Sequence, residues 1–193
     1  MSTLRLNGST SGYVELSAPA VAGSTALTVP FGVIQAVQDT DNVDSSYSLS
    51  AYGTTGNVLE VSITPTFANS KMLIMANVNG GTDYDIMGAR MMKNGSVMNG
   101  PNGDATDANN RWRAFSMVEL KTTSAYGHAS MSTVHLETLS GASTSTAITY
   151  AVQLINTDNV SRTVYLNRAS SDSDTSTNVG RTASNLIVME IAP

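Results

Sequence analysis

Few side chains in this sequence are of the kinds that carry out chemistry, and its two histidines are the first to consider. Ser and Asp are plentiful enough that a Ser-His-Asp unit could be drawn around either His128 or His135. However, no Gly-x-Ser-x-Gly elbow or comparable context surrounds any serine, so nothing in the sequence presents a nucleophile. His135 lies in an alternating segment, on the same side as Met131 and Thr133. We interpret it as a strand histidine on a half-polar face and expect no catalysis.

Acidic residues could instead hold a cation or act as a catalytic pair. Asp172, Asp174 and Asn178 have the look of a calcium loop, but the glycine and closing glutamate of an EF-hand are missing. Asp104 and Asp107 form a second acidic pair in a polar loop. Glycoside hydrolysis needs two carboxyl groups held about 5–9 Å apart in a groove, and nothing in the sequence indicates one. We interpret these residues as solvated turns and expect no metal and no cofactor.

A long polar loop is the best candidate for a binding surface. Residues 99–110 read NGPNGDATDANN, and loops this long inside a compact domain are usually functional or mobile. Trp112, the only tryptophan, follows directly. An exposed aromatic ring could stack on a sugar while Asn and Asp bind its hydroxyl groups, although Trp112 shares strand parity with Val118 and Leu120, which favours burial. The candidate contacts are Asn102, Asp104, Asp107, Asn109 and Trp112.

The composition predicts strands around these residues and excludes several classes of protein. Only 13% of the 193 residues are charged, against about 25% in average soluble domains. Helices that face solvent usually carry Glu and Lys, so polarity supplied by Ser, Thr, Asn and Gly predicts an all-β protein. A net charge of −5 without a basic stripe argues against nucleic acid as a partner. No apolar run is long enough to insert in a membrane, and no secretory signal is visible.

The absence of cysteine excludes disulfides, thiolate zinc sites and thiol nucleophiles. We therefore expect the protein to be made and folded in cytoplasm. Oligomerisation would be the obvious substitute for cross-links.

Three regions are expected along the chain. Residues 1–32 contain three short apolar segments interrupted by turns, predicting a β-ribbon that cannot bury a core alone. Residues 33–57 read as a connector, with 31–39 ambiguous between helix and strand and one strand near Tyr47–Ala51. Residues 58–193 form the head, where about eight strands are expected at the spacing of an antiparallel β-sandwich. A jelly roll is the first choice of topology, and an up-and-down or Greek-key sandwich is the second.

The terminal strand, Asn185–Ile191, is apolar on both faces except for Glu190. This pattern predicts a central strand that is dry on both sides, with the core on one side and a second layer or subunit on the other. Residues 112–121 are expected to form an earlier strand of the head. Several methionines on predicted strands could fill the core or line a contact between identical subunits. They are Met75, Met87, Met91, Met92, Met117 and Met189.

Three segments resemble parts of bacteriophage fibre and receptor-binding proteins. Residues 163–193 match a short strand that ends in Asn167-Arg168, a Ser/Asp/Thr arm, the Arg181-Thr182-x-Ser184 string and a terminal Glu190-Ile191. Residues 6–30 resemble a module found near attachment or stalk regions of these proteins. Residues 63–81 resemble the opening of the fibre head.

The resemblance implies a virion protein that forms homotrimers and binds the host surface without catalysis. The N-terminal segment would attach it to other virion proteins through Leu4, Leu6, Tyr13 and Leu16. The head would contact a host glycan or protein. A decoration or cement protein that stabilises the capsid or baseplate is the alternative. In either case the expected location is the virion, after synthesis in the host cytoplasm.

Overall fold

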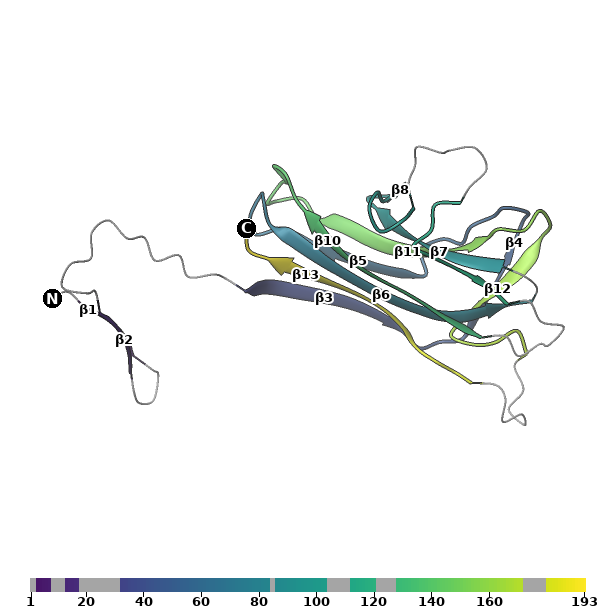
Figure 1. Cartoon of the computed structure of the whole chain (residues 1–193), viewed down its shortest axis with the longest axis horizontal. Coiled ribbons are helices and arrows are strands. Elements are labelled where there is room, and N and C mark those ends of the chain that lie inside the picture. Colours follow the sequence, from purple (N-terminus) through teal and green to yellow (C-terminus); the bar gives the residue numbers. More distant parts are fainter. Residues whose placement is uncertain are drawn as a thin grey trace. The chain divides into compact units, whose positions relative to one another are not determined.

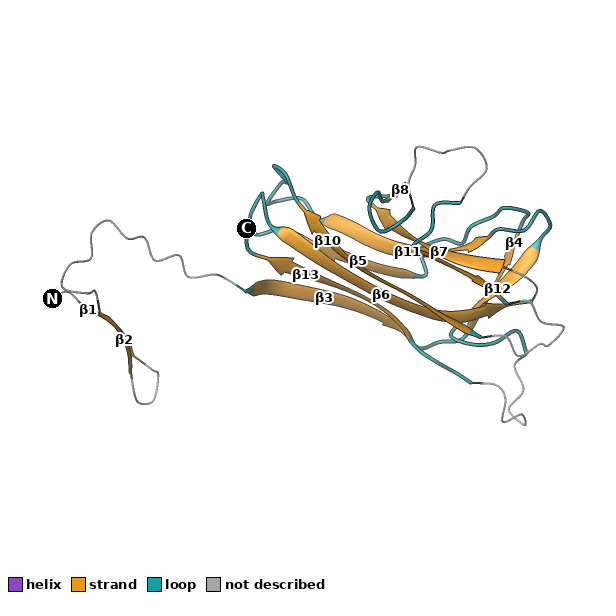
Figure 2. Ribbon diagram, in the orientation of Figure 1, coloured by secondary structure: helices purple, strands orange, loops and turns teal. Residues whose placement is uncertain are grey.

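The computed structural model divides the chain into two compact units, residues 1–30 and Phe31–Pro193. Every described element is a strand (Figure 2), and no described helix is long and apolar enough to cross a membrane. The structure describes residues 3–7, 13–17, 32–83, 86–103, 112–120, 128–171 and 180–193.

In the first unit, β1 (Thr3–Asn7) pairs antiparallel with β2 (Tyr13–Ser17). The register places Leu4 opposite Leu16, Leu6 opposite Val14, and Tyr13 opposite Asn7. The four predicted attachment residues therefore lie within one antiparallel pair. The third predicted strand, near Ala26–Val29, lies outside the described residues.

The second unit consists of two antiparallel sheets. The first sheet contains β3 (Val33–Asp41), β13 (Ser184–Ile191), β6 (Lys71–Thr82) and β10 (Ala129–Thr138), in that order. The pair β12 (Arg162–Leu166) and β4 (Ser45–Leu49) extends this sheet from the far end of β6. The second sheet orders β5 (Leu59–Ile63), β11 (Ile148–Asn156) and β7 (Ile86–Lys93), and β7 also pairs with β8 (Ser96–Val97) and β9 (Ser116–Glu119). Figure 1 shows β3, β13 and β6 running side by side.

This topology is that of a jelly roll. In chain order the main strands are β3, β5, β6, β7, β9, β10, β11 and β13, with β4, β8 and β12 as additions. The first sheet takes the first, eighth, third and sixth of them, and the second sheet takes the second, seventh, fourth and fifth. Each connection crosses between sheets except the one from β7 to β9. Two interleaved Greek keys produce this order, so the first choice of topology is confirmed.

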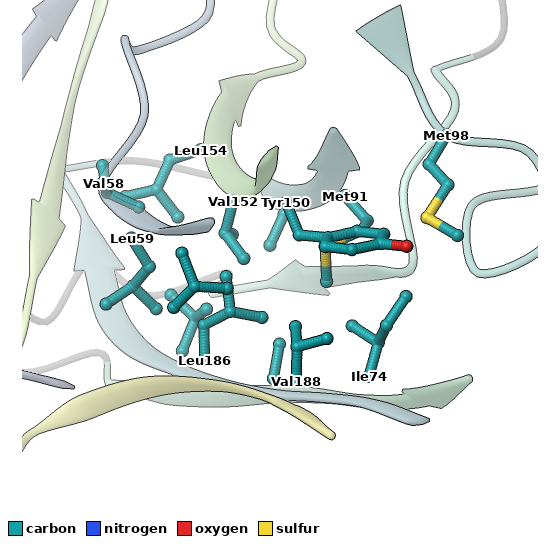
Figure 3. Packing of buried hydrophobic residues seen from close by; sticks show 14 of the residues in the cluster. Val58, Leu59, Ile74, Met91, Met98, Tyr150, Val152, Leu154, Leu186 and Val188 are labelled. Atoms are coloured by element: carbon teal, nitrogen blue, oxygen red, sulfur yellow. The ribbon is translucent and has the colours of Figure 1, made fainter. Parts of the chain in front are cut away.

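The core fills the space between the sheets. Leu186, Val188 and Ile74 from the first sheet face Val152 and Leu154 from the second (Figure 3), and all five side chains are fully buried. Burial of one such side chain stabilises the fold by about 1.5–3 kcal/mol. Strict alternation of apolar and polar residues directs the apolar side chains of a strand to the core. In β5, for example, Leu59, Val61 and Ile63 point inward between exposed residues.

One glycine is required by close approach of the backbone. Gly80 lies where β6 passes from β13 to β12, and a Cβ atom there would lie 2.1 Å from the carbonyl oxygen of Tyr165. No side chain fits at this distance, so only glycine lets β12 pair with the end of β6.

The expectation of a connector at residues 33–57 is wrong. β3 pairs with β13 along its whole length and β4 pairs with β12, so both belong to the sandwich. The polar appearance of β3 has a physical cause, because β3 is an edge strand among the described strands. Its outward residues, such as Gln38 and Thr40, face solvent, while Val37 packs against the core. The ambiguity between helix and strand is resolved as strand.

One further expectation needs correction. Within the described part of the strand predicted at 112–121, only β9 is a strand, because residues 112–115 run as irregular chain and pair only through single contacts. The inner face of the terminal strand β13 is dry, as expected, and the cover of its outer face by a second layer or subunit stays a prediction. Leu186, Val188 and Glu190 are fully buried, whereas Ile187 and Met189 are half-exposed, because no described layer covers the outer face of the first sheet.

Candidate functional site

The base of the long polar loop is a turn fixed by a buried amide. The Oδ1 atom of Asn102 accepts a hydrogen bond from the Met91 backbone N–H at 2.8 Å. Its Nδ2 atom donates to the carbonyl oxygens of Met91 and Met98, both at 2.7 Å. Asn102 is 3% exposed. In this position the side chain holds the turn to β7 and presents no polar atom to a receptor.

The same turn packs against the inner face of β10. Gly100 has a φ of 99°, and a Cβ atom there would lie 2.6 Å from Cε1 of the His135 ring. His135 thus serves as a packing surface for the turn, as expected of a strand histidine. His128, just before β10, lies 3.3 Å from the Thr182 hydroxyl, and partial burial lowers its pKa.

The two ends of the loop are held together. The Gly103 N–H donates to the Ala114 carbonyl oxygen at 3.2 Å. Arg113 donates to the carbonyl oxygens of Met98 and Gly103 at 3.3 Å and to the Asn99 side chain. Trp112 is half-buried at this base. These hydrogen bonds fix the two points at which the loop meets the sandwich. Asp104, Asp107 and Asn109 lie outside the described residues.

An open pocket of about 380 Å³ lies next to this turn. It is formed by the end of β10, the chain that links β10 to β11, and the Lys93-Asn94 turn. Its lining includes four hydroxyl-bearing residues, three other polar residues, and the apolar residues Leu139, Ala142 and Ile148. The lining residues are Lys93, Asn94, Glu137, Thr138, Leu139, Ser140, Ala142, Ser143, Thr146, Ala147 and Ile148.

A charged pair marks one wall of this pocket. Lys93 Nζ lies 2.5 Å from Glu137 Oε1, and the hydroxyl of Tyr150 donates to Glu137 Oε2 at 2.6 Å. Burial, followed by the hydrogen bond and charge of Glu137, raises the pKa of Tyr150 far above its usual range. Tyr150 therefore remains a neutral donor, and Lys93 also lies 5.8 Å from its ring centroid. Lys93 and Glu137 line the pocket, whereas Tyr150 is fully buried and supports Glu137 through its hydroxyl group.

The pocket and the loop base are neighbours on one strand. His135 contacts the turn and Glu137 lines the pocket. Residues two apart on a strand share a face and lie about 7 Å apart. The structure thus brings the base of the predicted binding loop next to a pocket that the sequence does not predict. No sequence signal joins Lys93, Glu137 and Tyr150, because only the sheet topology brings them together.

The buried carboxylate of Glu190 is the second conspicuous polar group. It accepts hydrogen bonds from Gln35 Nε2 at 2.6 Å, Ser70 Oγ at 2.5 Å, Thr66 N at 2.7 Å, Thr66 Oγ1 at 3.0 Å and Phe67 N at 3.2 Å. Burial alone would raise the pKa of Glu190, but these donors outweigh it and lower the pKa to about 2. A carboxylate with this many internal donors holds the end of β13 and has no capacity left for a ligand.

Other polar residues of the C-terminal motif also serve the fold. Asn167 is 1% exposed and Ser184 is fully buried, and the Ser184 hydroxyl donates to Asn167 Oδ1 at 2.7 Å. Asn167 Nδ2 donates to the carbonyl oxygens of Asp41 and Val43 at 2.9 and 3.0 Å. The motif therefore fixes the junction between β12, β13 and the turn after β3. Among the described residues, no group of three or more His, Cys, Asp or Glu is placed to hold a metal ion.

No family model matches this sequence, and no curated protein matches it. Among solved structures, the chain is similar to a chain in a structure of the infectious bursal disease virus Gx strain. The identity is 11% and the TM-score is 0.33, with 94% of this chain and 47% of the viral chain covered. The chain thus spans about half the length of that viral chain. A TM-score this low supports no argument about function.

Proposed function

We propose that this protein is a virion structural component, a fibre-like bacteriophage protein that binds a host-surface receptor without catalysis. Its fold is consistent with this role, because jelly rolls are common in viral capsid proteins and in lectin domains. The segments that resemble fibre proteins point the same way. Residues 1–30 form a separate unit and are the proposed attachment to other virion proteins.

The observation that carries the receptor-binding proposal is the pocket beside the loop base. Its lining combines Ser140, Ser143, Thr146 and the Lys93–Glu137 pair with apolar residues. A carbohydrate presents the complementary surface, with many hydroxyl groups around apolar ring faces. We therefore propose a host-surface glycan as the receptor.

A pocket-filling variant tests this assignment. Ser140 is exposed and lines the pocket, so Ser140→Trp should fill it without disturbing the core. Thr144, in the same linking chain but outside the lining, gives a matched control, Thr144→Trp. The purified parent should bind cells of a susceptible bacterium and their extracted polysaccharide. Ser140→Trp should lose this binding, and Thr144→Trp should retain it.

The alternative predicts a different pattern. A decoration or cement protein would bind particles that lack it and would not bind host cells as a free protein. That result, or unchanged cell binding by Ser140→Trp, would overturn the receptor site proposed here.

A further inference from the structure

The outer face of the first sheet carries an apolar surface that continues from strand to strand. Two neighbouring rows of paired residues cross β3, β13, β6 and β10, and both point away from the core. Six of their eight members are large apolar side chains, which we call the outer apolar face. The rows are Ala36–Met189–Leu73–Leu136 and Gln38–Ile187–Met75–Val134.

In the single chain these side chains are partly or largely exposed to solvent. Val134 is 70% exposed and Leu136 is 51% exposed, while Ile187, Met189, Leu73 and Met75 are half-buried by their neighbours. Single exposed apolar residues are ordinary on protein surfaces. A contiguous apolar patch across three strands, edged by polar residues, instead indicates an interaction surface.

The most exposed residues of this face, Val134 and Leu136, lie on an edge strand, β10. Among the described strands, β10 pairs only with β6. Edge strands are commonly protected by charged residues or Pro. The outward residues of β10 are Ser130, Ser132, Val134, Leu136 and Thr138, and none of them is charged. An edge strand without outward charges is prone to non-specific association unless another surface covers it.

The chemistry of the rim favours an identical copy as that cover. The row on one side of the outer apolar face is Thr40–Asn185–Asn77–Ser132, which is polar and uncharged. The row on the other side contains Lys71 as its one charged residue, with Ile191 and Thr138 as its neighbours. A face that carries charge repels its own copy, whereas amide and hydroxyl groups can both donate and accept across a symmetric contact. In the two rows of the face and the two rows beside it, Lys71 is the single charged residue.

The face is large enough for a specific contact. Four strands about 4.8 Å apart span roughly 19 Å, and four rows about 6.6 Å apart span roughly 26 Å. The footprint is then on the order of 500 Å² per copy, or about 1,000 Å² from two copies, which is the size at which specific interfaces begin.

We propose that the outer apolar face of the first sheet is the contact between copies of this chain. The contact joins two copies of the chain, goes beyond the proposed receptor site and does not depend on receptor binding. The half-exposed outer side of β13 then has a physical reason, because it becomes dry when a second copy covers it.

The test compares two valines of similar exposure. Val134 lies in the face, and Val43 is 62% exposed in the turn after β3, away from it. Light scattering at micromolar concentration should give a multiple of 20.2 kDa for the parent and for Val43→Lys, and 20.2 kDa for Val134→Lys. A parent that is monomeric, or a Val134→Lys variant that keeps the parent's mass, would refute the proposal.

A second measurement avoids a variant that fails to fold. The chain has no cysteine, so Val134→Cys and Val43→Cys each introduce a single thiol. With rising protein concentration, maleimide labelling should slow at position 134 and stay constant at position 43. Equal rates at all concentrations would show that the face remains open, or that another partner covers it, and would overturn the proposal. Binding of the parent to host cells is measured separately, so failure of the receptor proposal would not be confused with failure of this one.

Discussion

Substitution of Glu190 by Gln tests whether one buried carboxylate anchors the end of the jelly roll. The change keeps the size of the side chain and removes its charge. It also places an amide N–H₂ group among donors, including Ser70 Oγ and the Thr66 and Phe67 N–H groups. The pKa of Glu190 falls from 4.5 to about 2 on folding. Lowering a pKa by one corresponds to about 1.36 kcal/mol, so this lowering of about 2.5 corresponds to a contribution on the order of 3 kcal/mol near neutral pH.

The pH dependence gives the sharper signature. Because folding lowers the pKa of Glu190, its contribution is complete above pH 4.5 and is lost as the pH falls through about 2. The parent and Glu190→Gln should therefore differ most at neutral pH and converge towards pH 2. Urea unfolding at fixed protein concentration, repeated from pH 7 to pH 2, measures the difference directly. Glu60→Gln, at an exposed position of β5, is the control and should follow the parent.

Two results would refute this reasoning. A Glu190→Gln protein as stable as the parent at pH 7 would mean that the donors around position 190 find other partners at no cost. A constant difference from pH 7 to pH 2 would mean that the substitution acts through packing and not through charge.

Three further predictions concern the fold and its attachments. Val188→Asp buries a carboxylate without a partner in the core, so soluble protein should be lost on expression. Asn102→Ala leaves the buried Met91 N–H without its partner and removes one donor each from the carbonyl oxygens of Met91 and Met98, so it should lower the free energy of unfolding by about 1–3 kcal/mol, measured by urea unfolding. Removal of residues 1–30 should leave a head that melts cooperatively in calorimetry, because Phe31–Pro193 contains its own core, while incorporation into particles should fail.

Alternating patterns predicted the inner strands well, because one face of each is buried. Leu59, Val61 and Ile63 of β5 are buried between exposed residues, as their spacing indicated. The same pattern failed for β3, whose pairing with β13 joins residues as distant as Gln35 and Glu190. Local composition cannot reveal such a partner, and an edge strand with polar outward residues reads like a connector.

The candidate site was predicted only in part, for a related reason. A polar, turn-rich composition predicted the loop, but it could not show that Asn102 is buried and serves the fold. At the pocket wall, Glu137 is bonded to Lys93 and to the buried Tyr150, and these residues come from three strands in two sheets. Such a constellation depends on register, and a register is set by the whole sandwich.

Strand β10 connects the proposed contact between copies with the proposed receptor site. Its outward residues Val134 and Leu136 belong to the outer apolar face, while His135 and Glu137 point inward to the turn and the pocket. Because side chains alternate, a substitution on one face leaves the other face in place. A monomeric Val134→Lys protein should therefore bind a soluble glycan fragment with the Kd of the parent. On whole cells it should bind more weakly, by roughly 10²–10⁴-fold, because linked sites gain avidity that one site lacks. Equal loss on the fragment and on cells would instead show that the pocket requires the neighbouring copy.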